Sequence, residues 1–96
     1  QAAQLNGQGA SAVAIGFQAG QDNQGTTAVA IGANAGQNDQ DTSSVAIGTG
    51  AGQNDQGTNA VAIGNGAGAG NAGTGQGNLS IAIGFTQYVC ILFSKL

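Results

Sequence analysis

One motif, Ala-Ile-Gly, recurs at a fixed spacing of 16 residues and constrains this chain more than any other feature. The glycines that close it are Gly16, Gly32, Gly48 and Gly64. Whole units repeat with them, and the predicted coils are 11–26, 27–42, 43–58 and 59–78, the last with an enlarged loop. Partial coils are expected at 1–10 and 79–84. A fixed period of this length is the signature of a solenoid, in which each unit buries its surface against its neighbours.

Each unit contains one clear strand signal. In Ala28-Val29-Ala30-Ile31 small and β-branched residues alternate with period two, which predicts a strand. A glycine follows directly and allows the chain to turn. These turn glycines are Gly16, Gly32, Gly48, Gly64 and Gly84. We expect a second short strand through Ala35-Gly36-Gln37. The predicted fold is all-β, a parallel β-solenoid (β-roll) of about five coils.

Stacked coils should place equivalent residues in columns about 4.8 Å apart. We expect the β-branched residues of the strand to point inward, opposed by Ala19, Ala35, Ala51 and Ala67. This predicted core ladder comprises Val13, Ile15, Val29, Ile31, Val45, Ile47, Val61, Ile63, Ile81 and Ile83. One valine and one isoleucine per coil do not offset the entropy of ordering a whole unit. Contact with other protomers is therefore expected.

The residues expected to point outward are small, and a flat surface of methyl groups favours close approach of a second subunit. The C-terminal segment 85–96 breaks the repeat and carries most of the large apolar side chains. It is expected either to cap the last coil or to dock on another subunit. The candidate subunit interface comprises Ala14, Ala30, Ala46, Ala62, Ala82, Phe85, Tyr88, Val89, Ile91, Leu92 and Phe93.

Composition excludes several classes of function. The chain has no histidine and a single cation, Lys95, so no nucleophile and base pair is expected and no basic patch for nucleic acid. The longest apolar run, 89–93, is far shorter than the roughly 20 residues of a transmembrane helix. We predict no catalytic residue, no cofactor and no structural metal.

Polar residues also recur in columns. Pairs of aspartate and asparagine recur at the outer turn and suggest a calcium-binding site. They are Asp22-Asn23, Asn38-Asp39 and Asn54-Asp55. Because each unit has a single carboxylate at the tip of the turn, we favour a structural role, in which side-chain amides hydrogen-bond to the turn backbone. Two glutamine columns predict amide hydrogen bonds from coil to coil. They are Gln24, Gln40, Gln56 and Gln21, Gln37, Gln53. A rank of polar residues rich in hydroxyls suggests an ice-binding surface, although structural hydrogen bonding is favoured. It comprises Thr26, Thr42 and Thr58 beside Ser11, Thr27, Ser43 and Asn59.

The segments SAVAIGFQAG, TAVAIGANAG and SSVAIGTGAG resemble the head repeats of trimeric autotransporter adhesins. The resemblance covers residues 11–84, and Val29, Ile31 and Gly32 with their equivalents match its structural core. It implies a left-handed parallel β-roll, three rolls around an axis, a location outside the cell or on a surface, and binding to host surfaces. The repeat here is longer and its second half is rich in Gln, Asn and Asp, so no binding residue is carried over.

The function expected from these observations is a structural subunit of an extracellular fibre or filament, with the chain itself as partner. A trimeric adhesin-like head that binds a surface is the first alternative. An ice-binding or calcium-binding solenoid is the second.

Overall fold

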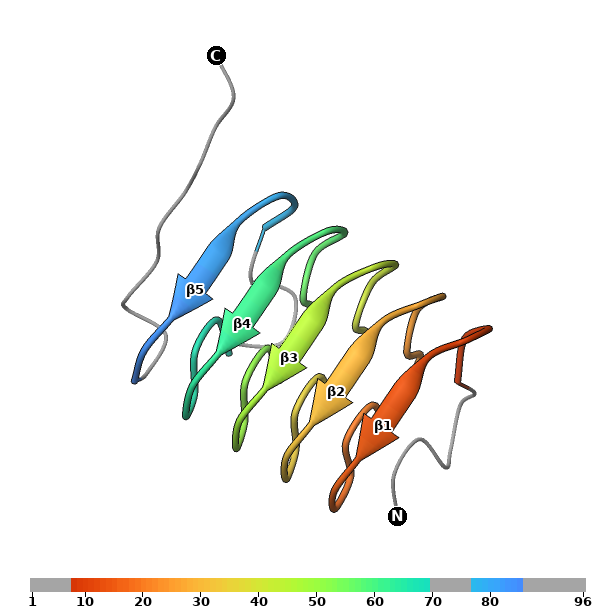
Figure 1. Cartoon of the computed structure of the whole chain (residues 1–96), viewed down its shortest axis with the longest axis horizontal. Coiled ribbons are helices and arrows are strands. Elements are labelled where there is room, and N and C mark those ends of the chain that lie inside the picture. Colours follow the sequence, from red (N-terminus) through yellow and green to blue (C-terminus); the bar gives the residue numbers. More distant parts are fainter. Residues whose placement is uncertain (1–7, 70–76, 86–96) are drawn as a thin grey trace.

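A computed structural model describes residues 8–69 and 77–85 and contains a sheet of parallel strands wound into a solenoid (Figure 1). The strands are β1 (Val13–Ile15), β2 (Val29–Ile31), β3 (Val45–Ile47), β4 (Val61–Ile63) and β5 (Ile81–Ile83). Their order in the sheet is β1-β2-β3-β4-β5, and every neighbouring pair is parallel. The described residues contain no helix, and the predicted parallel β-solenoid is confirmed.

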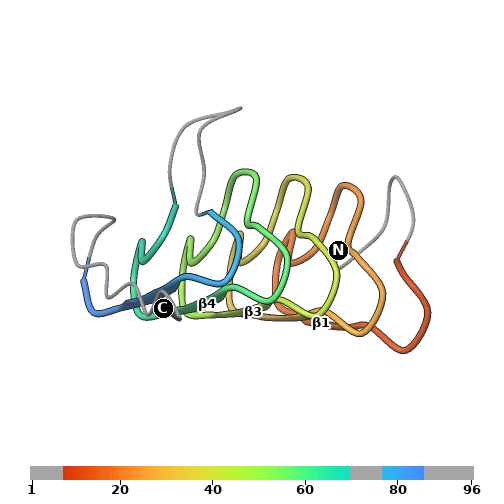
Figure 2. The same ribbon diagram turned by 90° about the horizontal axis from the view of Figure 1, so that it is seen from above.

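Successive strands pair in strict register, valine or isoleucine against valine or isoleucine and alanine against alanine. Val29 pairs with Val45, and Ala30 pairs with Ala46. Between strands the chain loops out and returns to the next rung, so that the loops also lie in a row (Figure 2). Because the repeat places the same residue types at the same point of each coil, every residue of a strand meets its own counterpart.

The return half of each coil is made of turns. The predicted second strand through Ala35-Gly36-Gln37 is wrong, because Asn34 and Gly36 have φ of 60° and 51° and the chain cannot stay extended there. Pairing in this half is limited to isolated bridges, such as Asp22 with Asn38 and Asn38 with Asn54.

A sharp turn follows every strand at the glycine of the motif. Gly32 has φ of 124°, a region that residues with a side chain rarely occupy. A Cβ on Gly32 would lie 2.8 Å from the carbonyl carbon of Gly48 in the next coil. The equivalent φ values are 123° at Gly16, 125° at Gly48, 124° at Gly64 and 134° at Gly84. Glycine is thus required both for the backbone conformation and for the close approach of the coils.

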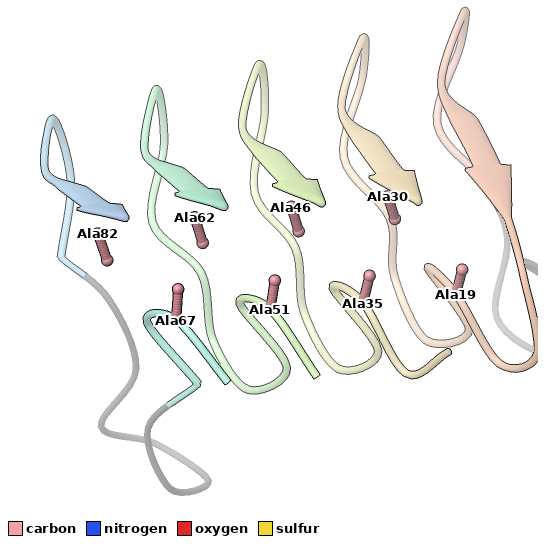
Figure 3. Packing of buried hydrophobic residues seen from close by; sticks show 8 residues of the cluster. All are labelled: Ala19, Ala30, Ala35, Ala46, Ala51, Ala62, Ala67 and Ala82. Atoms are coloured by element: carbon pink, nitrogen blue, oxygen red, sulfur yellow. The ribbon is translucent and has the colours of Figure 1, made fainter. Parts of the chain in front are cut away.

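The core consists of alanine, not of valine and isoleucine. The strand alanines point into the solenoid and meet alanines of the opposite turn, such as Ala46 against the row that contains Ala51 (Figure 3). The buried cluster comprises Ala19, Ala30, Ala35, Ala46, Ala51, Ala62, Ala67 and Ala82, with Ala14 partly buried against it. A second column is also buried, at Ala28, Ser44, Ala60 and Ser80.

The predicted core ladder is therefore wrong, and so is the assignment of Ala14, Ala30, Ala46, Ala62 and Ala82 to a subunit interface. Val13 is 41% exposed, Ile15 58% and Ile83 47%, and Ile63 is exposed as well. The half-buried members of the ladder are Val29, Ile31, Val45, Ile47, Val61 and Ile81. The alternation along the strand is as predicted, but the alanine side faces the core and the valine and isoleucine side faces outward. The coil is so narrow that opposing methyl groups fill it, and larger side chains are left outside.

Of the predicted C-terminal interface residues, Phe85 is described and is 70% exposed. Tyr88, Val89, Ile91, Leu92 and Phe93 lie outside the described residues. In the part of the chain that the structure describes, no helix is long and apolar enough to cross a membrane.

Candidate assembly surface

The outward side chains of the five strands form one apolar surface, which we call the Val-Ile face. It consists of Val13, Val29, Val45, Val61 and Ile81 in one column and Ile15, Ile31, Ile47, Ile63 and Ile83 in the other. Parallel pairing in register sets the rungs about 4.8 Å apart. None of these outward positions carries a polar or charged side chain. The face is a regular, two-column array of branched apolar groups.

The backbone beneath the Val-Ile face is occupied by hydrogen bonds between coils. The amide of Val29 donates to the carbonyl of Ser44 at 2.9 Å, and the amide of Gly32 donates to the carbonyl of Ile15 at 2.7 Å. Since the main-chain groups within the sheet are paired in this way, the face offers a partner little besides apolar contact. It has no means of binding a polar ligand by hydrogen bonds.

Buried glutamines support the face from inside the coil. The Nε2 atoms of Gln24, Gln40 and Gln56 each donate a 2.7 Å hydrogen bond to a strand carbonyl, on Val13, Val29 and Val45 respectively. Gln40 also donates to Oε1 of Gln56 at 3.1 Å, which links two coils. Sequence analysis predicted the link between coils but missed the brace across the coil. The available signal was that every complete coil places glutamine at this same point.

A second amide ladder, partly buried, runs along the return half. Nε2 of Gln37 donates to Oε1 of Gln21, and Nε2 of Gln53 donates to Oε1 of Gln37, both at 2.9 Å. Nδ2 of Asn38 donates to Oδ1 of Asn54 at 2.8 Å. The predicted hydrogen bonds from coil to coil are confirmed here, and their role is to hold successive coils together.

Carboxylates gather on the outer edge of the return half. A hollow of about 330 Å³ is lined by Asn23, Asp39, Gln40, Asp41, Asp55 and Gln56. Within it, Oδ1 of Asp39 accepts a 2.9 Å hydrogen bond from Nδ2 of Asn23. Among the described residues, no group of three or more histidine, cysteine or acidic side chains is placed to hold a metal ion. The geometry gives the calcium alternative no support.

The rank of hydroxyls lies at a corner of the coil and not on a flat surface. Ser11, Thr27, Ser43 and Asn59 all have left-handed backbone, with φ between 57° and 61°. Oγ1 of Thr27 donates to the carbonyl of Thr26 at 2.6 Å and lies 3.0 Å from Oγ of Ser43. The hydroxyls of Thr27 and Ser43 are thus engaged within the solenoid, which favours a structural role over ice binding for these two residues. The left-handed corners at residues other than glycine were not foreseen from the sequence.

Comparison of the chain with known proteins identifies no related protein. No protein-family model, curated protein or solved structure matches this chain. The resemblance to adhesin head repeats thus depends on the VAIG segments alone. The handedness and the threefold association that it implies stay predictions.

Proposed function

We propose that this chain is a structural subunit that assembles with copies of itself through the Val-Ile face, as part of an extracellular fibre or filament. The observation that carries the proposal is the outward position of every valine and isoleucine of the five strands. The proposal assigns no catalytic role to any residue.

A surface of this kind favours burial against a partner. One face of a sheet that borders water ordinarily carries polar side chains, whereas the outward positions of β1 to β5 are apolar without exception. Contiguous apolar patches that are exposed on a soluble protein usually mark a site of interaction. Covering the Val-Ile face removes it from water and stabilises the assembly by the hydrophobic effect.

A second copy of the chain fits this surface better than an unrelated partner. The columns of the face repeat at the rung spacing of the solenoid, and a second solenoid presents branched side chains with the same repeat. Two such sheets can pack face to face about 10 Å apart with their side chains interdigitated. The face has no charge with which to select a partner of different chemistry.

The adhesin-like alternative uses the same surface. Three rolls around an axis would each turn the Val-Ile face inward and would close the assembly at three subunits. A fibre, in contrast, continues to grow with concentration. The proposed location outside the cell is supported by the resemblance of the VAIG segments to adhesin head repeats. It applies both to the fibre subunit and to the adhesin-like head.

The test is to measure the width and mass of assemblies of the full chain by negative-stain electron microscopy and sedimentation at two concentrations. Ile31→Asp/Ile47→Asp places charge on the Val-Ile face. Thr26→Asp/Thr42→Asp is the matched control, because it adds the same charge at two exposed positions away from that face. Circular dichroism checks that all three proteins keep their β-structure.

We expect wild type and the threonine control to form particles more than one solenoid wide, and the isoleucine variant to form particles one solenoid wide. A wild-type protein that is already one solenoid wide, or an isoleucine variant as wide as wild type, would contradict the proposal. Discrete wild-type trimers at both concentrations select the adhesin-like arrangement of the face. Longer particles at the higher concentration select the fibre.

A further inference from the structure

We infer that the two end coils of the solenoid bind each other between copies, head to tail, with Phe85 of one copy stacked on Phe17 of the next. This inference rests on the proposed function, since it concerns the same self-assembly. It adds a second contact, directed along the solenoid and separate from the Val-Ile face.

The two outermost strands of the described sheet carry the first observation. β1 and β5 lie at opposite ends of the row of strands, and each pairs with one neighbour in the strand order (Figure 1). All strands are parallel, so each strand has two different edges, one toward the preceding strand and one toward the following strand. The free edge of β5 is equivalent to the edge of β4 that pairs with β5. The free edge of β1 is equivalent to the edge of β2 that pairs with β1. The two ends are thus complementary to each other and not to themselves.

The link between the last two coils shows which hydrogen bonds a stacked copy would form. The amide of Val61 donates to the carbonyl of Ser80, and the amide of Gly84 donates to the carbonyl of Ile63, both at 2.9 Å. One rung further, the amide of Ile81 meets the carbonyl of Ala12 in the next copy. Likewise, the amide of Gly16 in the next copy meets the carbonyl of Ile83.

The sequences of the two end coils match in this register. Residues 77–85 read GNLSIAIGF and residues 9–17 read GASAVAIGF. Stacking them pairs Ile81 with Val13, Ala82 with Ala14 and Ile83 with Ile15, as β4 pairs with β5 inside the chain. The column of strand alanines and the Val-Ile face both continue across the junction.

The phenylalanines are the feature that distinguishes the end coils from the inner ones. Phe17 and Phe85 each follow a turn glycine and are 60% and 70% exposed. The inner coils have Ala33, Thr49 and Asn65 at this point. Within one chain the two rings are separated by four rungs, about 19 Å, so neither ring can cover the other. In the stack they become neighbours on adjacent rungs, where two aromatic rings attract each other.

Gly77 leaves room for such a stacked coil. At the same corner of the inner coils a Cβ would strike the next coil. It would lie 2.5 Å from the carbonyl carbon of Asp41 for Gly25, and 2.6 Å from the amide nitrogen of Asn78 for Gly57. At Gly77 a Cβ would meet no atom of residues 8–69 or 77–85 within 4 Å. Among the described residues, nothing covers the last coil at the corner where each earlier coil meets its successor.

A contact between two different ends repeats without closing and builds a filament along the solenoid axis. An unpaired strand edge is also the usual template for pairing with another chain. The second copy is the occupant that reproduces the strand hydrogen bonds, the column of strand alanines and the aromatic pair together.

Disulfide trapping tests the inference with the full chain in a Cys90→Ser background. Phe17→Cys/Phe85→Cys places cysteines on adjacent rungs of neighbouring copies, with Cα atoms about 5 Å apart, within the range of a disulfide. Inside one chain they are about 19 Å apart and cannot be joined. The single variants Phe17→Cys and Phe85→Cys are the matched controls, since neither end pairs with itself in a head-to-tail stack.

After mild oxidation we expect the double variant to give a ladder of covalent multimers on a denaturing gel, which reductant converts to monomer. The single variants should remain monomeric. A double variant that stops at monomer or dimer, or single variants that cross-link as strongly, would overturn the head-to-tail contact. Wide wild-type assemblies without a ladder overturn this inference alone. A ladder from particles one solenoid wide overturns only the proposed role of the Val-Ile face.

Discussion

The side-chain amide of Gln40 donates a 2.7 Å hydrogen bond to the main-chain carbonyl of Val29, across the inside of their coil. Gln40 is fully buried, and its amide reaches the strand because the space between strand and turn is only as wide as two facing alanines. The coil is thus held together by a polar brace as well as by methyl contacts. The same brace recurs from Gln24 to Val13 and from Gln56 to Val45.

The first prediction concerns this brace. Gln40→Met keeps the length of the side chain but removes the hydrogen bonds to Val29 and to Gln56. Loss of hydrogen bonds at a buried site costs about 1–3 kcal/mol, and we expect the free energy of unfolding to fall by that amount in urea denaturation followed by circular dichroism.

Gln37→Met is the matched control for that measurement. Gln37 is half-buried and its side chain hydrogen-bonds only to other glutamine side chains in the second amide ladder, so its replacement should cost less. An equal loss of stability in the two variants would show that the brace across the coil has no special role.

A second prediction separates the inside of the strand from its outside. Ala46 is fully buried, and Ala46→Val adds two methyl groups to a filled interior, which should lower the free energy of unfolding by about 1–3 kcal/mol. Val45→Ile adds one methyl group on the Val-Ile face and should change it by less than about 0.5 kcal/mol. Thermal or urea unfolding measures both. A tolerated Ala46→Val beside a damaging Val45→Ile would mean that valine is inside after all.

The third prediction concerns the corner at Thr27. Its φ of 57° is unfavourable for a β-branched residue, whereas Asn59 takes the same corner with φ of 58°. Asparagine adopts this conformation more readily, and we expect this gain to exceed the loss of the exposed bonds from the Thr27 hydroxyl to Thr26 and Ser43. Thr27→Asn should therefore raise the free energy of unfolding by about 0.5–1 kcal/mol. Thr26→Asn, at the exposed neighbour with no positive φ, serves as control in the same melts. No gain at residue 27, or an equal gain at residue 26, would contradict the argument.

A fourth prediction follows from the chemistry of the Val-Ile face. Its contact contains no ion pair, so raising sodium chloride from about 0.1 to about 1 M should not dissociate the assembly. Ammonium sulfate strengthens apolar burial and should shift sedimentation toward larger particles at a fixed protein concentration. Dissociation by sodium chloride would instead indicate that charged residues hold the subunits together.

Much of the fold was accessible from the sequence. The spacing of the Ala-Ile-Gly triplets defines the coil, the period-two alternation at Val29–Ile31 locates the strand, and Gly32 marks the turn. These features are local, and the repeat carries them from coil to coil. The glutamine ladder was predictable for the same reason, because equal positions in stacked coils must lie side by side.

Which side of the strand is inside was decided by the tertiary structure alone. The period-two alternation places Ala30 and Ile31 on opposite sides of the strand. The pattern is the same whichever side is buried, so it does not predict which side faces the core. The answer depends on how closely the strand approaches the turn at Ala35, and this gap is narrow enough for the Gln40 amide to reach the carbonyl of Val29. Since only methyl groups fit in that gap, the larger side chains are left on the outer surface, where another copy can bury them.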